Sequence, residues 1–223
     1  MAGSSSASSH SSPSGDRTGS SDPSSDAKEQ AEVIELVRSG YDRLHRFIEK
    51  GLEYFQWLAK GRITTAETAD LALVLKRAAD KTPGLRASAV RFEVHRQETP
   101  FPIQGRAADL EQALQYLLEN ALKHSPNQRH VVVDLRLEGD RALLSVSDRG
   151  VGLRAEALRE VFQPLTSADV AHHSSGSGLS LALAKVILEA HGGTIRAESE
   201  GLGQGSTFTI ELPAVQVAAG SKA

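Results

Sequence analysis

The short stretch DRGVG at residues 148–152 constrains this chain more than any other segment of its 223 residues. The strand-like run RALLSVS precedes it, and Ala142, Leu144 and Val146 place an apolar side chain at every second position. Asp148 continues that parity, so its carboxylate is predicted to face the core, where an unpaired charge is costly. The stretch therefore predicts a buried acid that accepts hydrogen bonds, beside a turn whose glycines allow close approach of a ligand.

The composition limits the class of protein. The charges nearly balance, with 25 Lys+Arg against 28 Asp+Glu, so nothing electrostatic favours a nucleic-acid partner. There is no cysteine for a disulfide or a thiolate metal site, and no apolar run reaches the roughly 18 residues that a membrane span requires. We therefore expect a cytoplasmic protein with no membrane segment in this chain, or the cytoplasmic part of a larger sensor.

The two ends of the chain are predicted to be disordered. Twelve of the first 25 residues are serine, and no Val, Ile, Leu or aromatic residue occurs before Val33. Such a segment cannot bury enough apolar surface to offset chain entropy, so residues 1–27 are predicted to form a tail or linker. Residues 215–223 are predicted to form a second, flexible tail.

Residues 28–60 show the spacing of a long amphipathic helix. Apolar or small residues alternate in steps of three and four, as in a heptad seam: Ile34, Val37, Tyr41, Leu44, Ile48, Gly51, Phe55 and Leu58. Phe47, Leu52 and Tyr54 widen the stripe, which favours a bundle with several partner helices over a two-stranded coiled coil. An ordinary core helix is the alternative. A second helix is predicted over 65–79, and Thr-Pro-Gly at 82–84 ends this helical segment of residues 28–83.

Residues 84–214 are predicted to form a mixed α/β (α+β) domain. Strands are expected over 89–95, 130–137, 141–147, 194–199 and 207–212, and helices over 107–124, 156–161 and 180–191. Clean alternation in the second strand predicts one buried and one solvated face. Helices on one side of a mostly antiparallel sheet make a two-layer sandwich.

Three polar residues of the 107–124 helix are candidate ligands. Asn120, Lys123 and His124 lie within one turn of each other, so an amide oxygen, an ammonium and an imidazole converge. These groups could hold a magnesium ion and phosphates. A solvated helix face is the simpler interpretation of these residues taken alone.

Two glycine-rich stretches follow. Gly176 and Gly178 precede a helix, whose free backbone N–H groups and positive dipole end suit a phosphate. Gly203, Gly205 and Thr207 open the last strand and could pass close to the base of a nucleotide. As isolated glycines they would be turn residues. The adjacent His172 and His173 lack carboxylate or cysteine company and are interpreted as loop residues, not as a metal site.

In this order the motifs resemble the nucleotide boxes of the GHKL ATPase superfamily, and specifically the catalytic domain of sensor histidine kinases. The asparagine box is LLENALKHS, the first glycine box DRGVG, the phenylalanine box VFQPL, the second glycine box GSGLSL and the last box GQGSTF. Spaced motifs in one order are far more specific than any single motif. The upstream YDRLHRFIEKGLEYFQWLAKG is similar to the second helix of the kinase dimerisation bundle.

The resemblance implies a Bergerat fold and a phosphotransferase that uses ATP and Mg²⁺. It implies that Asn120 ligates the magnesium ion, that Lys123 and His124 assist at the phosphates, and that Asp148 accepts a hydrogen bond from the adenine amino group. The other implied nucleotide-binding residues are Gly150, Gly152 and Thr207 near the base, and Gly176, Gly178, Leu179 and Ser180 around the phosphates. A homodimer through residues 28–60 and a response regulator receiver domain are the implied protein partners.

The chain departs from the family pattern in three places. Ser180 replaces the third glycine of the second glycine box, and Tyr116 stands four residues before Asn120, where kinases commonly have another asparagine. No stretch resembles the box that carries the phosphoacceptor histidine. His45 lies beside the heptad seam but lacks the acidic residue directly after it, so it is a weak candidate for that role.

Two other functions remain open from the sequence. An ATP hydrolase of the same superfamily would have a glutamate at position 116 to activate water, and a phenol with a reference pKa near ~10 is a poor base at neutral pH. Glu119, next to Asn120 in the sequence, is about 100° away from it around the helix and therefore faces elsewhere, so it does not supply that base. The second alternative is a non-catalytic module that binds nucleotide, dimerises and regulates a partner.

Overall fold

The computed structural model describes residues 23–87, 90–97, 100–125, 130–165 and 178–215. The predicted tails therefore lie largely outside the described residues, and Gly176, His172 and His173 lie outside them entirely. The chain divides into two compact units, residues 1–41 and residues 42–223. Within the described residues, no helix combines the length and the apolar content needed to cross a membrane.

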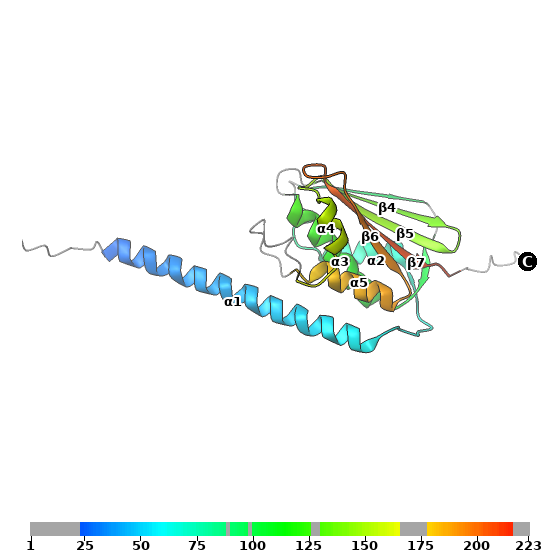
Figure 1. Ribbon diagram of the computed structural model, residues 1–223, viewed down its shortest axis with the longest axis horizontal. Helices are drawn as coiled ribbons and strands as arrows, with labels where there is room; N and C mark the ends of the chain where they lie inside the picture. Colours follow the sequence, from blue (N-terminus) through cyan, green and yellow to red (C-terminus); the bar gives the residue numbers. More distant parts are fainter. Residues whose placement is uncertain (1–22, 88–89, 98–99, 126–129, 166–177, 216–223) are drawn as a thin grey trace, which may run out of the picture. The chain divides into compact units, whose positions relative to one another are not determined.

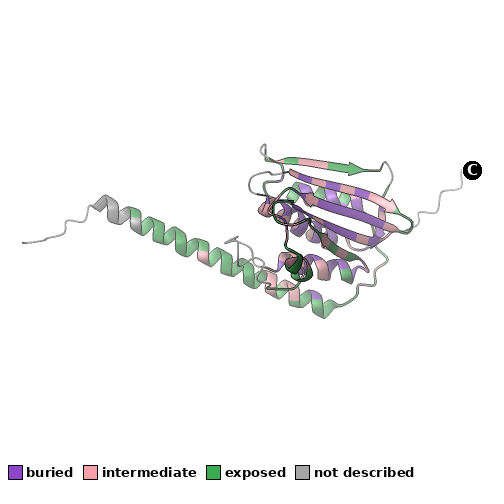
Figure 2. Cartoon of the chain, turned by 45° about the horizontal axis from the view of Figure 1, so that its top comes forward, coloured by how far each residue is buried: buried purple, intermediate pink, exposed green. Residues whose placement is uncertain are grey.

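Helix α1 (Pro23–Lys60) is the longest element. It begins earlier than the predicted residue 28, at a proline, which is favourable as a first helical residue because no backbone N–H is lost there. Its predicted seam is exposed, and Figure 2 shows the colour of exposed residues along most of this helix. The large seam side chains with their exposed fractions are Ile34 (67%), Val37 (66%), Tyr41 (65%), Leu44 (58%), Ile48 (50%), Phe55 (68%) and Leu58 (52%).

The second unit contains a five-stranded sheet with the order β2-β4-β5-β7-β6. The strands are β2 (Arg91–Arg96), β4 (His130–Glu138), β5 (Arg141–Asp148), β7 (Ser206–Pro213) and β6 (Thr194–Glu198). β2 pairs with β4 in parallel and the other neighbours are antiparallel. The predicted mixed, mostly antiparallel sheet is confirmed, and its central strands are the most buried (Figure 2).

Helices cover one face of this sheet. α3 (Ala107–His124) and α5 (Ser180–Ala190) lie against it, and α2 (Leu71–Lys81) packs on α3 (Figure 1). The short α4 (Ala155–Glu160) follows the DRGVG turn. Leu114, Leu144, Leu183 and Phe208 are among the fully buried side chains between the two layers. The predicted two-layer sandwich is therefore confirmed.

A small second sheet was not predicted. β1 (Thr68–Asp70) pairs antiparallel with β3 (Pro102–Gln104), so the helix predicted from residue 65 begins only at Leu71. Asp70 ends β1 and caps α2, because its carboxylate accepts the Ala72 N–H at 2.9 Å. The sequence TTAETAD is short and polar, and its strand forms only because β3 supplies the partner.

Candidate functional site

Asp148 is buried at the end of β5, as its parity predicts, with 6% of its surface exposed. Its Oδ1 accepts the Gly150 N–H at 2.8 Å and faces the Ser125 hydroxyl at 3.4 Å. Its Oδ2 accepts the Ser206 hydroxyl at 2.5 Å. The carboxylate is thus held in place by donors from three separate segments, which meets the requirement of a buried acid for hydrogen bonds.

The turn after Asp148 lies against the C-terminus of α3. A Cβ added to Gly150 would lie 2.1 Å from the His124 carbonyl oxygen, so only glycine fits there. The same carbonyl accepts the Val151 N–H at 3.0 Å. Gly152 has φ +67° and its added Cβ would lie 2.0 Å from the Gly201 oxygen. The first glycine box is therefore required by contact of one backbone with another, on both sides of the turn.

Ser199 holds the DRGVG turn to the loop before β7. Its hydroxyl accepts the Leu153 N–H at 3.0 Å and donates to the Gly205 carbonyl at 2.7 Å. Gly205 N–H in turn donates to the Gly150 carbonyl at 3.2 Å. The DRGVG turn and the loop before β7, about 50 residues apart in the sequence, are therefore held together by hydrogen bonds beside Asp148. Ser199 belongs to none of the predicted motifs.

Ser206, and not Thr207, shares the face of Asp148. The register pairs Asp148 with Ser206 and Ser147 with Thr207, and alternate residues of a strand point to opposite faces. The Thr207 hydroxyl is 2.9 Å from that of Ser147 on the far face of the sheet. Ser206, which the sequence alone did not single out, is therefore the residue of this strand that contacts Asp148, and the role of Thr207 near the base stays a prediction.

The three polar residues of α3 lie at its C-terminal end. Asn120, Lys123 and His124 are all half-buried, and His124 is the last helical residue. The backbone of His124 touches the DRGVG turn through its carbonyl. The last turn of α3 and the acidic turn of β5 therefore lie side by side.

α5 begins where the second glycine box ends. Gly178 has φ +63°, Leu179 is buried with 3% exposed, and Ser180 is the first helical residue. The Gly178 carbonyl accepts the Leu165 N–H at 3.1 Å, which joins the described residues on either side of 166–177. Since the Leu179 side chain belongs to the core, only its backbone is available to a ligand.

A polar cluster that the sequence reasoning missed joins α1, α3 and α5. Lys50 Nζ donates to Ser180 Oγ at 2.7 Å and lies 4.8 Å from the centre of the Tyr116 ring. The Tyr116 hydroxyl donates to Glu53 Oε2 at 2.5 Å. Burial first, and then this hydrogen bond, raise the pKa of Tyr116 above its ordinary value.

The face of α1 that carries this cluster also reaches the core. Trp57 is 5% exposed and its ring centre lies 6.2 Å from that of the buried His191. Lys50, Glu53, Tyr54 and Trp57 follow the i, i+3, i+4, i+7 spacing of one helix face. That spacing is visible in the sequence, but the heptad seam on another face of the helix is the more regular pattern and dominated the prediction.

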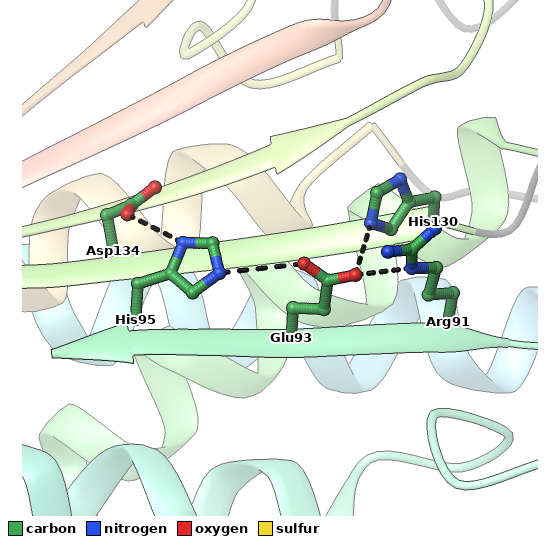
Figure 3. A network of polar contacts seen from close by, with 5 residues as sticks. All are labelled: Arg91, Glu93, His95, His130 and Asp134. Atoms are coloured by element: carbon green, nitrogen blue, oxygen red, sulfur yellow. Dashed lines mark hydrogen bonds and ion pairs between the residues drawn. The ribbon is translucent and has the colours of Figure 1, made fainter.

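A second polar network lies along β2, at the edge of the sheet, and the neighbouring β4 (Figure 3). Glu93 contacts Arg91, His130 at 3.3 Å and His95 at 3.5 Å, and His95 contacts Asp134 at 3.2 Å. The hydrogen bond from Arg91 lowers the pKa of Glu93. The Arg91–Glu93 contact is an ion pair, and the histidine contacts become ion pairs only when the imidazole is protonated. Over the described ranges no three His, Cys, Asp or Glu side chains are grouped as metal ligands.

His45 lies on the exposed side of α1. Its side chain is 54% exposed and its Nδ1 is 3.3 Å from Glu49 Oε2, one turn further along the helix. No acidic residue follows it directly, as the sequence indicated.

The fold and this arrangement match one known family. The profile described as "Histidine kinase-, DNA gyrase B-, and HSP90-like ATPase" matches residues 105–216, which include α3, both glycine boxes and β7. The chain belongs to this family. Within the family, the proteins it resembles are sensor histidine kinases, as the motifs predicted.

Individual relatives agree with this membership. The chain is 42% identical over 106 residues to the circadian input-output histidine kinase CikA of Synechococcus elongatus, covering 47% of this chain and 14% of the relative. The mycobacterial sensor histidine kinase MprB has a structure with a TM-score of 0.59 and 29% identity over 67% of this chain and 98% of that one. Full-length ShkA in complex with AMPPNP gives a TM-score of 0.69 at 25% identity, over 86% of this chain and 40% of that one.

The chain is shorter than these curated relatives. It spans 14%, 31% and 40% of the length of three of them. The matched part is the ATPase domain of the histidine kinase family, which is the catalytic, ATP-binding part of those proteins.

Proposed function

We propose that this chain is the ATP-binding catalytic region of a two-component sensor histidine kinase, which transfers the γ-phosphate of ATP to a histidine not recognisable in this chain. The observation that carries the proposal is the buried carboxylate of Asp148, fixed by the Ser206 hydroxyl and the Gly150 N–H beside a glycine turn. Family membership supports it.

Asp148 is suited to recognise adenine. A carboxylate has about four lone-pair sites, and the contacts with Gly150, Ser125 and Ser206 use three of them. One acceptor site therefore remains for an exocyclic amino group. Ser206 lies on the same face as Asp148, so in this proposal its hydroxyl also lies beside the base, next to the predicted Thr207.

The phosphates would lie between the end of α3 and the start of α5. Lys123 and His124 supply polar groups at the first, and the free N–H groups of α5 after Gly178 supply donors at the second. Asn120 supplies one neutral oxygen. Mg²⁺ keeps several waters and takes further oxygen ligands from substrate phosphates, so Asn120 would be one ligand among these. When bound, the ion would neutralise charge on the phosphates.

The chemistry is transfer of a phosphoryl group. A nitrogen of the acceptor imidazole bonds to the γ-phosphorus, the bond from that phosphorus to the β,γ-bridging oxygen breaks, and ADP leaves while the imidazole loses its proton. Lys123 stabilises the negative charge at the phosphates. Tyr116 is not a base for water at this site, because its raised pKa and its bond to Glu53 keep the phenol protonated.

The exposed seam of α1 supports the remaining part of the proposal. Its apolar side chains suit a second copy of the chain, so residues 28–60 form the dimerisation helix of a homodimer. A response regulator receiver domain is the partner for the phosphorylated protein, and the catalytic region works in the cytoplasm. The domain boundaries at 28–83 and 84–214 belong to the same proposal.

Asp148→Asn tests the adenine contact. The amide keeps the size of the side chain but turns an N–H donor toward a site that needs an acceptor, so MgATP should bind about tenfold to a hundredfold more weakly by calorimetry. Ser147→Ala is the matched control, because Ser147 precedes Asp148 in β5 and bonds Thr207 on the opposite face. Unchanged affinity in Asp148→Asn, or an equal loss in Ser147→Ala, would contradict the proposal.

A further inference from the structure

One lysine of α1 stands at the N-terminus of α5. Lys50 Nζ donates to Ser180 Oγ at 2.7 Å and lies over the ring of Tyr116, and Lys50 and Ser180 are both half-buried. The first N–H groups of α5 have no acceptor within the helix. A cation from outside the ATPase fold therefore stands where the proposed function places the nucleotide phosphates.

Within the part of the chain that the structure describes, no carboxylate lies within the 4.0 Å of an ion pair with Lys50. Among the ion pairs of the described residues none includes Lys50, and the nearby Glu53 carboxylate instead accepts the Tyr116 hydroxyl. Burial lowers the pKa of Lys50, and the Lys123 cation adds to this, while Glu119 and Glu53 act in the opposite direction. A half-buried ammonium whose contacts are a hydroxyl and an aromatic ring is stabilised when an anion joins it.

We propose that Lys50 is a phosphate-binding residue of the ATP site, supplied by α1. One N–H of its ammonium holds Ser180 and another donates to the terminal phosphate of the bound nucleotide. This inference rests on the proposed function and adds a residue to that site. It also accounts for Ser180, because the glycine usual at this position of the second glycine box has no hydroxyl to hold the lysine.

The consequence is a preference for ATP over ADP that depends on α1. A lysine has three donors, so it contacts the hydroxyl and a phosphate oxygen at once. ADP lacks the γ-phosphate that this ammonium contacts in ATP, so removal of the ammonium affects ADP binding less. ATP then strengthens the contact of α1 with α5, which links nucleotide occupancy to the helix that carries the dimerisation seam.

Calorimetry with MgATP and with MgADP on Lys50→Met tests this. We expect ATP affinity to fall about tenfold and ADP affinity to change less than about twofold, the size expected for one lost hydrogen bond to a charged group. Lys60→Met is the matched control: it removes the same charge from the same helix, about 15 Å further along, where the ammonium lies over Trp57. It should leave both affinities unchanged.

Ser180→Gly completes the test. It should weaken ATP binding severalfold in the wild-type background and have no further effect in Lys50→Met, since the hydroxyl acts through the lysine. Lys50→Arg keeps the charge and should keep the preference for ATP. If Lys50→Arg binds ATP and ADP equally well, the proposal is overturned, even if the methionine variant does not fold. Equal losses for ATP and ADP, or none, also overturn it. Failure of the wild type to bind ATP would instead refute the proposed function.

Discussion

Gly150→Ala is the sharpest structural perturbation that the site offers. An added Cβ would lie 2.1 Å from the His124 carbonyl oxygen, where ordinary contact needs 3.4 Å, and 2.8 Å from Asp148 Oδ1. Neither neighbour is the flexible end of a long side chain. The clash must therefore move the end of α3 away from the turn and break the 3.0 Å bond from Val151 N–H to that carbonyl.

The magnitude follows from these two losses. Overpacking a close contact costs about 1–3 kcal/mol, and leaving a buried hydrogen-bonding group unsatisfied costs about 1–3 kcal/mol, so we expect a loss of about 3 kcal/mol in the free energy of unfolding. For a protein of this size that lowers the Tm by about 6–12 °C. MgATP affinity should fall as well, because the Asp148 carboxylate moves with the turn.

Thermal unfolding followed by circular dichroism, with calorimetric titration of MgATP, measures both effects. Gly51→Ala is the control, because a Cβ there meets nothing within 4 Å. Alanine is more favourable than glycine inside a helix by about 1 kcal/mol, so this variant should not lower the Tm. A Gly150→Ala protein with the Tm and ATP affinity of the wild type would refute the reasoning that contact between the two backbones demands this glycine.

Two further perturbations test other parts of the molecule. Replacing both Leu44 and Ile48 by Asp puts like charges into the exposed seam, so sedimentation should show that association is lost while MgATP affinity is unchanged; a variant that associates like the wild type would contradict the seam. Because the pKa of Glu93 is lowered from 4.5 in the folded protein, its ion pairs contribute stability above that pH and lose it as the pH falls further. The Tm difference between wild type and Glu93→Gln should therefore be present at neutral pH and vanish in acid; a difference that grows in acid would contradict this sign.

Local pattern predicted much of the ATPase fold. The apolar periodicity of α3 gave its bounds, 107–124, because side chains on one helix face repeat at a spacing visible in the sequence. An apolar residue at every second position of β4 and β5 gave both strands and the burial of Asp148. The ordered glycine and asparagine motifs gave the family, which the profile match confirmed. In each case the signal lies in the residues of the chain as written and does not depend on which segments pack together.

The misplaced or missing features depend on a partner segment. β1 exists only through its pairing with β3, and the register of β7 on β5 decides that Ser206 and not Thr207 faces Asp148. A shift of one residue reverses every side chain of a strand, so a motif without its register leaves the choice open.

The sequence by itself determined the main helices, the strands of the larger sheet, the buried acid and the family motifs, since each of these follows from local spacing and residue type. Only the tertiary structure decided why Gly150 must be glycine, because the carbonyl that excludes a side chain there belongs to His124. It also brought Lys50 of α1 to Ser180 of α5, a pair 130 residues apart in the chain. Such contacts have no local signature, because they depend on how separate elements pack and not on the propensities of either one.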